Sequence, residues 1–250
     1  MIRWMVLFLV TITIAGQPRG GRPCATSLAR CPARGCAESG TPEAAANEVR
    51  RTLSRAAPRA MLTIDDFESL QAAAERLFRQ GFAIPAEQRA RLRRIYRDRG
   101  LKIGEGDIVR AQAYIVGTPY LRPAGSANCN LAGTANDNIR LHLAAHPNDT
   151  AHESIIAEII PSFRPAGWTL AKLRRLQRDE RLLMVTGQLF YDSKRLVNHS
   201  PEAGLVNQPA RRSLWELHPV SEVLVCMRAQ NDCRPNDPLA WRRLADYRER

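Results

Sequence analysis

A glutamate and a histidine two positions apart are the residues best placed to do chemistry in this sequence. Glu216 and His218 belong to the run Trp215–Pro219, in a segment of alternating hydrophobicity. In a β-strand, residues two apart share a face, so the carboxylate and the imidazole would lie side by side. Such a pair can act in acid–base chemistry or supply part of a metal site. It can equally be structural, forming a local hydrogen bond that anchors the strand before Pro219.

A second segment repeats this arrangement. Asn138, Arg140 and His142 alternate with apolar residues at 139, 141 and 143, which predicts a strand with one polar face. We expect the two strands to form a common binding surface, with a tyrosine from a third strand beside it. The predicted ligand-binding residues are Asn138, Arg140, His142, Tyr191, Glu216 and His218.

Motifs of the common enzyme classes are missing from the sequence. It has no nucleophile elbow, phosphate loop, dinucleotide fingerprint or calcium loop. His142 and His146 are four apart, but they fall on a strand and a turn and not on one helix face. We therefore expect no catalytic residue, no metal and no cofactor. The alternative is a metal-dependent hydrolase that uses His218, Glu216 and His142.

The first residues predict export. Arg3 precedes an apolar run, Trp4–Ile14, which is shorter than the roughly 20 residues needed to cross a bilayer. Small residues near Ala15 suit signal cleavage, so residues 1–16 are predicted to be a signal peptide. The expected location is periplasmic or secreted, with no transmembrane segment left after cleavage.

Cysteine usage agrees with an oxidising compartment. All six cysteines follow the predicted cleavage point, at positions Cys24, Cys31, Cys36, Cys129, Cys226 and Cys233. All six are disulfide candidates, and six cysteines allow 15 pairings that sequence alone does not separate. Cys129 and Cys226 are the favoured pair, because both are expected at strand ends. A nucleophilic Cys129 is the alternative, but the sequence identifies no base to activate it.

The net charge of +12 suggests an anionic partner, and the distribution of the charge indicates which part of the chain would bind it. Residues 105–227 carry 13 basic and 12 acidic side chains, whereas residues 1–60 carry nine basic and three acidic. A possible anionic partner is therefore expected at the basic N-terminal region. Nucleic acid is a weakly supported partner for the region after residue 104, where Tyr114, Tyr191, Arg110 and Arg140 are the candidate contacts.

Hydrophobic periodicity divides the chain into four parts. Residues 17–104 are predicted to form a cysteine-containing arm followed by helices: a short one from Pro42, one from Thr63 to Gly81 with a capping box, and one from Pro85 to Asp98. Residues 105–227 are predicted to form a β-domain, and residues 228–250 a helical tail that starts at Asp237-Pro238. Residues 1–16 complete the division as the signal peptide.

The expected fold class is α+β. Predicted strands fall at residues 109–115, 139–143, 154–160, 182–191 and 214–226, with a helix at 169–178. A helix between strands three and four is the element order of an OB-fold, a five-stranded Greek-key barrel. Gly187 inside a strand suits a bend or a bulge in such a barrel. A small α+β sandwich with the same order is the alternative.

The region from Asp107 to Cys226 resembles a family of uncharacterised secreted bacterial proteins. The residues that carry this are Ser126-Ala-Asn-Cys129-Asn130, Val185-Thr-Gly-Gln-Leu-Phe-Tyr-Asp192 and Arg212-Ser-Leu-Trp-Glu-Leu-His-Pro-Val220, with Gly35-Cys36-Ala37 in the arm. The resemblance covers about half of the chain. It implies a signal peptide, a helical N-terminal part and an OB-like β-region, and no known activity.

These observations favour an exported, non-enzymatic binding protein. Its ligand would be an oligosaccharide, an envelope protein or a nucleic acid, held on the polar face of an OB-like barrel. Besides the hydrolase, one more alternative is a structural envelope protein whose basic N-terminal helices dock an acidic partner.

Overall fold

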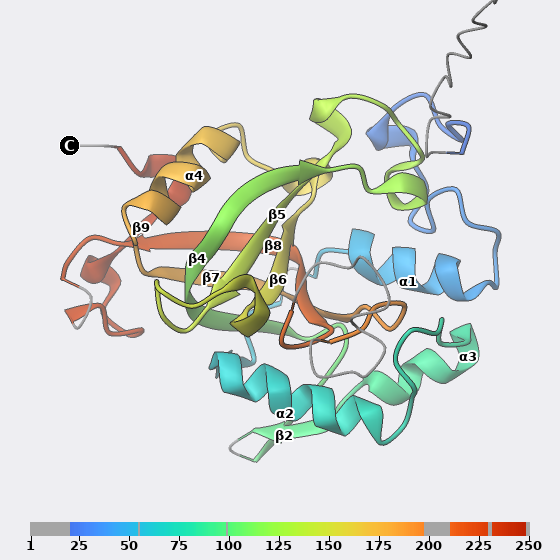
Figure 1. Cartoon of the computed structure of the whole chain (residues 1–250). Coiled ribbons are helices and arrows are strands. Elements are labelled where there is room, and N and C mark those ends of the chain that lie inside the picture. The colour runs from blue at the N-terminus through green and yellow to red at the C-terminus, as the bar shows by residue number, and fades with distance from the viewer. Residues whose placement is uncertain (1–20, 55, 99, 198–210, 230–231, 249–250) are drawn as a thin grey trace, which may run out of the picture.

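The computed structural model describes residues 21–54, 56–98, 100–197, 211–229 and 232–248. It shows a mixed α/β protein in which helices surround one large sheet (Figure 1). The expected signal peptide over residues 1–16 lies outside the described residues. Among the residues that are described, no helix is long and apolar enough to cross a membrane.

Seven strands form the main sheet, and five of them close into a ring. The five are β4 (Ile108–Arg122), β5 (Asn138–Ala144), β6 (Ile155–Ile159), β8 (Trp215–Cys226) and β7 (Leu183–Tyr191). Neighbours in this order are hydrogen-bonded, and β7 pairs with β4 to complete the ring. The β6–β8 pairing is parallel, whereas the other four pairings of the ring are antiparallel. Short strands extend the sheet: β1 (Ala60–Leu62) beside β4, and β9 (Trp241–Arg243) beside β8.

Two irregularities let these strands bend around the ring. In β4, residues 108–113 pair with β7 and residues from Tyr114 onward pair with β5, and the register with β5 shifts between Val116 and Tyr120. In β7, the register with β8 shifts on both sides of Gly187. A Cβ at Gly187 would lie 2.9 Å from the Cβ of Leu217. The register shifts on both sides of Gly187 agree with the predicted bend or bulge at this residue.

The ring interior is the hydrophobic core. Alternate residues of each strand point inward, including Ile139 and Leu141 of β5 and Leu217 of β8, all at most 1% exposed. Helix α2 (Ile64–Glu75) packs Phe67 and Leu70 against this cluster. Its predicted capping box is present, since Thr63 and Asp66 exchange side chain–backbone hydrogen bonds. The predicted apolar face of residues 139, 141 and 143 is thus confirmed as an inward face.

Helix α4 (Leu170–Arg178) occupies the predicted place between β6 and β7. The Thr169 hydroxyl accepts a hydrogen bond from the Lys172 amide and so caps its first turn. Leu173 and Leu176 are buried in the core, while the remaining face carries basic residues. The other helices are α1 (Pro42–Arg51), which begins at the predicted residue, and α3 (Ala86–Arg89).

Three of the predicted helices are wrong in extent or type. Helix α2 ends at Glu75, six residues before Gly81. The segment expected to be one helix from Pro85 to Asp98 forms α3, a 3-10 turn and then β2 (Tyr96–Asp98), which pairs with β3 (Leu101–Ile103). As a helix, this segment would bury only a narrow apolar stripe of Leu92, Ile95 and Tyr96. Because helices in proteins are stabilised mainly by burial of an apolar face, pairing of Tyr96–Asp98 in a hairpin is preferred here. The C-terminal segment starts with Asp237 capping Leu239, as expected, but continues into β9 because the edge of β8 is open to pairing.

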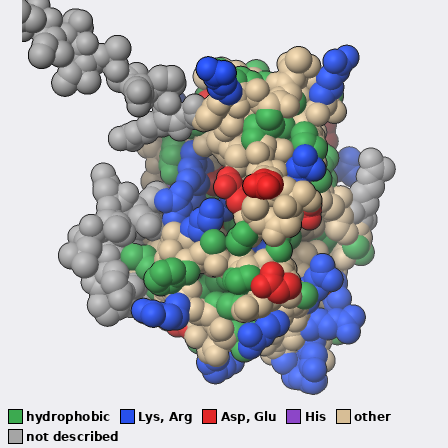
Figure 2. All heavy atoms as spheres, turned by 90° about the vertical axis from the view of Figure 1, so that its right-hand side faces the viewer, with side chains coloured by type: hydrophobic (Ala, Val, Ile, Leu, Met, Phe, Trp, Pro, Cys, Tyr) green, Lys and Arg blue, Asp and Glu red, His purple; other side chains and the backbone are tan. Residues whose placement is uncertain are grey.

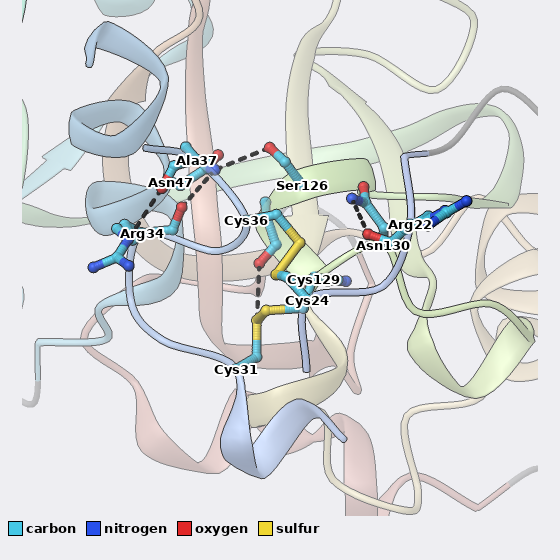
Figure 3. The surroundings of a disulfide bond; sticks show 12 residues. Arg22, Cys24, Cys31, Arg34, Cys36, Ala37, Asn47, Ser126, Cys129 and Asn130 are labelled. Atoms are coloured by element: carbon cyan, nitrogen blue, oxygen red, sulfur yellow. Dashed lines mark hydrogen bonds between the residues drawn. A yellow bond between two sulfur atoms is a disulfide. The ribbon is translucent and has the colours of Figure 1, made fainter. Parts of the chain in front are cut away.

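All six cysteines form disulfides, as predicted. The pairs are Cys24–Cys36, Cys31–Cys129 and Cys226–Cys233. The favoured Cys129–Cys226 pairing is therefore wrong. Cys129 follows β4 in a loop that meets the N-terminal arm, whereas Cys226 ends β8 near β9. Figure 3 shows the first two bridges side by side. Cys31–Cys129 fastens the arm to the 125–130 loop, and Cys24–Cys36 joins two residues of the arm itself.

Candidate functional site

The outward faces of β5, β6 and β8 carry charged residues at adjacent positions. Arg140 of β5 is paired across the sheet with Glu158 of β6. Glu216 of β8 is paired with Ile156, two residues before Glu158. Because residues two apart share a face, the two glutamates and the arginine meet on one surface of the ring. All three side chains are at most 4% exposed.

Glu216 contacts three other charged or polar side chains of this cluster. Its Oε1 accepts hydrogen bonds from Arg140 Nη2 at 3.1 Å and Arg211 Nη1 at 2.8 Å. Its Oε2 lies 3.2 Å from Nδ1 of His218. Burial alone would raise the pKa of Glu216, but the His218 hydrogen bond and the two guanidinium groups hold it well below its usual range. Glu216 is therefore ionised at neutral pH.

Glu158 is held in the same way. Its Oε1 lies 3.0 Å from Arg122 Nη1 and 3.4 Å from Arg140 Nε, and its Oε2 accepts from Asn138 Nδ2 at 2.6 Å. Burial opposes ionisation, but the charges of His218, Arg140 and Arg122 lower the pKa of Glu158 to about 2. Neither buried glutamate carries a proton near pH 7, so neither is suited to act as a general acid.

A third carboxylate, Asp192, follows the last residue of β7. Three arginines surround it: Arg50 of α1 at 3.2 Å, Arg195 at 3.6 Å and the buried Arg211 at 3.8 Å. Arg50 thus connects the N-terminal helix to the β-region. Asp192 is itself only 5% exposed.

A cavity of about 170 Å³ opens above these residues, and we call it the polar cavity. Its floor includes Asn138, Glu158, Glu216 and His218 from the three strands. One rim comes from residues 122–127, which follow β4, and another from residues 192–195, which follow β7. Both rims contribute cations, among them Arg122 and Lys194.

Positive charge exceeds negative charge at the polar cavity. The described carboxylates that line it are Asp192, Glu158 and Glu216. The described cations that line it, or contact those carboxylates, are Arg50, Arg122, Arg140, Lys194, Arg195 and Arg211. Six cations against three carboxylates leave an excess of three positive charges before His218 is counted. The buried Arg140 and Arg211 are matched by the three buried carboxylates. The excess therefore lies on Arg50, Arg122, Lys194 and Arg195, which are partly or fully exposed and can contact an anionic ligand.

The same balance argues against a cation. Ligand atoms of Glu158, Glu216 and His218 lie within 4.8 Å of one another, close enough for one metal ion. However, His218 Nδ1 faces two carboxylates that only accept hydrogen bonds, so this nitrogen carries the proton. The nearby guanidinium groups already neutralise both glutamates and would repel a divalent ion.

His142 lies apart from the charged cluster. Its Nδ1 is 2.8 Å from Ser154 Oγ, and that hydroxyl donates to the carbonyl of Ala151. Since a serine has one hydrogen to donate, His142 Nδ1 must be the donor in their contact. Burial and the charges of Arg140 and Arg211 lower the pKa of His142 to about 4. Of the trio named for a hydrolase, the structure brings together Glu216 and His218, with Glu158 as their third neighbour.

The tyrosines named as candidate contacts are core residues. Tyr191 is 0% exposed and packs its ring 5.2 Å from that of Trp215. Tyr114 is 2% exposed. Arg110 is half-buried and paired with Glu222 on the other side of the ring, away from Arg140. These residues therefore do not share a surface with Asn138 and His218.

Sequence reasoning missed seven residues of the site, namely Arg50, Arg122, Glu158, Asp192, Lys194, Arg195 and Arg211. Glu158 stands in a run read as wholly buried, although a glutamate among isoleucines is itself a signal of a partnered charge. Arg122 is the last residue of β4, which continues past the predicted strand at 109–115. Asp192 and Arg211 flank the segment between β7 and β8, and no local pattern marks them.

Comparison with known proteins identifies no relative of this chain. No family model matches the chain, and no curated protein or solved structure is significantly similar to it.

Proposed function

We propose that the five-stranded ring is an OB-type barrel. Taken in chain order, β4, β5, β6, β7 and β8 correspond to the five strands of that fold, and α4 falls between the third and the fourth. The ring order and the parallel pairing of the third with the fifth strand support this assignment. The two register shifts provide the bends that a small closed barrel needs.

In OB-folds, ligands bind on the face of strands two and three, between the loops that join strands one to two and four to five. Here those elements are β5, β6 and the segments after β4 and β7. They supply Asn138, Glu158, Arg122 and Lys194 of the polar cavity. The position of the cavity thus coincides with the usual ligand site of the proposed fold.

We propose that the protein is a non-enzymatic binding protein that takes the acidic group of a ligand into the polar cavity. The excess of three positive charges is the observation that carries this proposal. A carboxylate or phosphate would accept hydrogen bonds from Lys194 and the rim arginines and balance that excess. The buried glutamates hold the arginines in place and are not available as acids.

We further propose that the protein acts outside the cytoplasm, in the periplasm or secreted. Three disulfides support an oxidising compartment, and the apolar run after Arg3 supports export. A ligand from the cell envelope or its surroundings fits this location.

The test is isothermal titration of the oxidised protein with glucuronate, glucose 6-phosphate and glucose. We expect the two anions to bind and neutral glucose not to bind. Lys194→Gln should weaken both anions, because it removes a rim cation. Lys102→Gln removes the same charge from β3, which does not line the polar cavity, and should leave binding unchanged. Equal binding of glucose and glucuronate, or equal effects of the two variants, would contradict the proposal.

A further inference from the structure

A larger cavity lies between α1 and the α3 segment, and we call it the α1–α3 cavity. Its volume is about 430 Å³, against about 170 Å³ for the polar cavity. Val49 and Thr52 line it on one side, Ala90 and Arg93 on the other, and Glu105 and Gln188 at its base. Figure 2 views the molecule from the side that carries α1 and α3 in Figure 1, and basic, acidic and apolar side chains are interspersed there.

A third, small cavity of about 40 Å³ lies against α1 and shares lining residues with each of the two. Arg89 lines both the small cavity and the α1–α3 cavity. Arg50 and Lys194 line both the small cavity and the polar cavity. The three cavities therefore follow one another around α1.

The walls between these cavities are fixed. The guanidinium groups of Arg50 and Arg89 lie 4.4 Å and 4.8 Å from the centroid of the Phe190 ring. Arg89 also pairs with Glu105, and both side chains are at most 7% exposed. Its Nη2 donates to the carbonyl of Tyr191 at 2.9 Å. The site is thus largely formed before any ligand arrives, which reduces the entropic cost of binding.

The chemistry of the α1–α3 cavity suits a ligand rich in hydroxyl groups. Carboxylates such as Glu48 accept hydrogen bonds and guanidinium groups such as Arg93 donate them, while a hydroxyl does both. Val49, Ala86 and Ala90 add apolar surface. Single-stranded nucleic acid needs accessible aromatic rings for stacking. The aromatic rings of the described residues that line the three cavities, Phe190, Tyr191 and His218, are at most 4% exposed.

From this arrangement we infer that the ligand is a linear acidic oligosaccharide. One acidic unit occupies the polar cavity, and the chain continues around α1 into the α1–α3 cavity. A chain that starts in the polar cavity, passes the small cavity and enters the α1–α3 cavity needs about three sugar units, one at each cavity. This inference rests on the proposed function, since it extends the site from the polar cavity.

The test measures affinity as a function of chain length, with oligomers of galacturonic acid from one to six units as probes. Affinity should rise with each added unit up to about three units and then level off. Ala90→Trp should fill part of the α1–α3 cavity, weaken the trimer about tenfold and leave the monomer unchanged. Gln88→Trp, at an exposed position of α3 that does not line the cavity, is the matched control.

The outcomes separate the two proposals. If the monomer binds but longer chains bind no better, or if Ala90→Trp has no effect on the trimer, the extended site is wrong and the polar cavity acts alone. If no oligomer binds at any length, both the proposed function and its extension fail. If a single-stranded oligonucleotide of matched charge binds more tightly than the hexamer, the ligand class is wrong.

Discussion

Arg140 of β5 is completely buried, and its Nη2 donates to Oε1 of Glu216 on β8 at 3.1 Å. The contact spans β6, which lies between the two strands in the ring. The same carboxylate oxygen also accepts from Arg211, which is equally buried. One carboxylate therefore fixes two arginines beneath the polar cavity.

Glu216→Gln should destabilise the protein by about 3–5 kcal/mol, because it leaves two buried guanidinium groups without their shared counter-charge. The matched control is Glu222→Gln on the same strand. Glu222 pairs with Arg110, but each side chain is about a third exposed, so its loss should cost less than about 1 kcal/mol. Urea unfolding of both variants measures the difference. Equal costs would show that the buried cluster does not organise this face.

Acid should destabilise the fold in two steps. Because the pKa of His142 is lowered to about 4 from an unfolded value near 6.5, the unfolded chain binds its proton first, and stability falls as pH drops through that window. Glu158, with its pKa lowered to about 2, loses its contribution as pH falls below about 4.5. Unfolding free energies measured from pH 7 to pH 3 test this dependence.

His142→Gln should flatten the profile between pH 6.5 and 4 and leave the steeper loss at lower pH in place. The His142 share is on the order of 2 kcal/mol after allowance for its partial exposure. A profile unchanged by His142→Gln would contradict the assignment of the upper window to this histidine.

Gly35→Ala should release the N-terminal arm. Gly35 has φ 63°, and a Cβ there would lie 2.0 Å from the carbonyl oxygen of Ser126. Gly40 also has a positive φ, of 79°, but an added Cβ meets nothing within 4 Å. Gly40→Ala should therefore lower the free energy of unfolding by only the cost of a positive φ at a residue with a Cβ, about 1–2 kcal/mol. Gly35→Ala should lower it by clearly more, because the clash with Ser126 adds to that cost. Thermal unfolding compares them, and equal costs would mean that the arm does not pack tightly on the 125–130 loop.

The disulfides should differ in their contribution to stability. Cys31–Cys129 closes a loop with a sequence separation of 98, and Cys226–Cys233 one of only 7. Loop-closure entropy then predicts losses of about 4.7 and about 2.5 kcal/mol when each pair is changed to serine. Peptide mapping under non-reducing conditions checks the pairing itself, and a Cys129–Cys226 peptide would contradict the structure.

The sequence predicts the elements of the β-region well, because strand alternation and the switch from helical to strand period are local signals. The inward residues of β5 and β8 and the position of α4 all follow from such patterns. The prediction of one helix from Pro85 to Asp98 is wrong because Tyr96 pairs with Ile103 in a β-hairpin. Such a pairing depends on residues outside the segment, and the periodicity of the segment itself does not reveal it.

The site was half predictable. Asn138, Arg140, Glu216 and His218 were identified because each alternates with core residues on its own strand. Asp192 and Arg211 join them only through the fold, since their carboxylate and guanidinium groups meet at 3.8 Å after the chain has closed the ring. The charge excess that carries the proposed function therefore becomes visible only in three dimensions.

The most direct test of that function is an amide NMR titration of the nitrogen-labelled, oxidised protein with glucuronate and, separately, with glucose. We expect glucuronate-dependent shifts that centre on Arg122, Asn138, Glu158 and Lys194, and no such shifts with glucose. Shifts that spread over the basic surface of α4, or that are the same for both sugars, would contradict an anion site in the polar cavity.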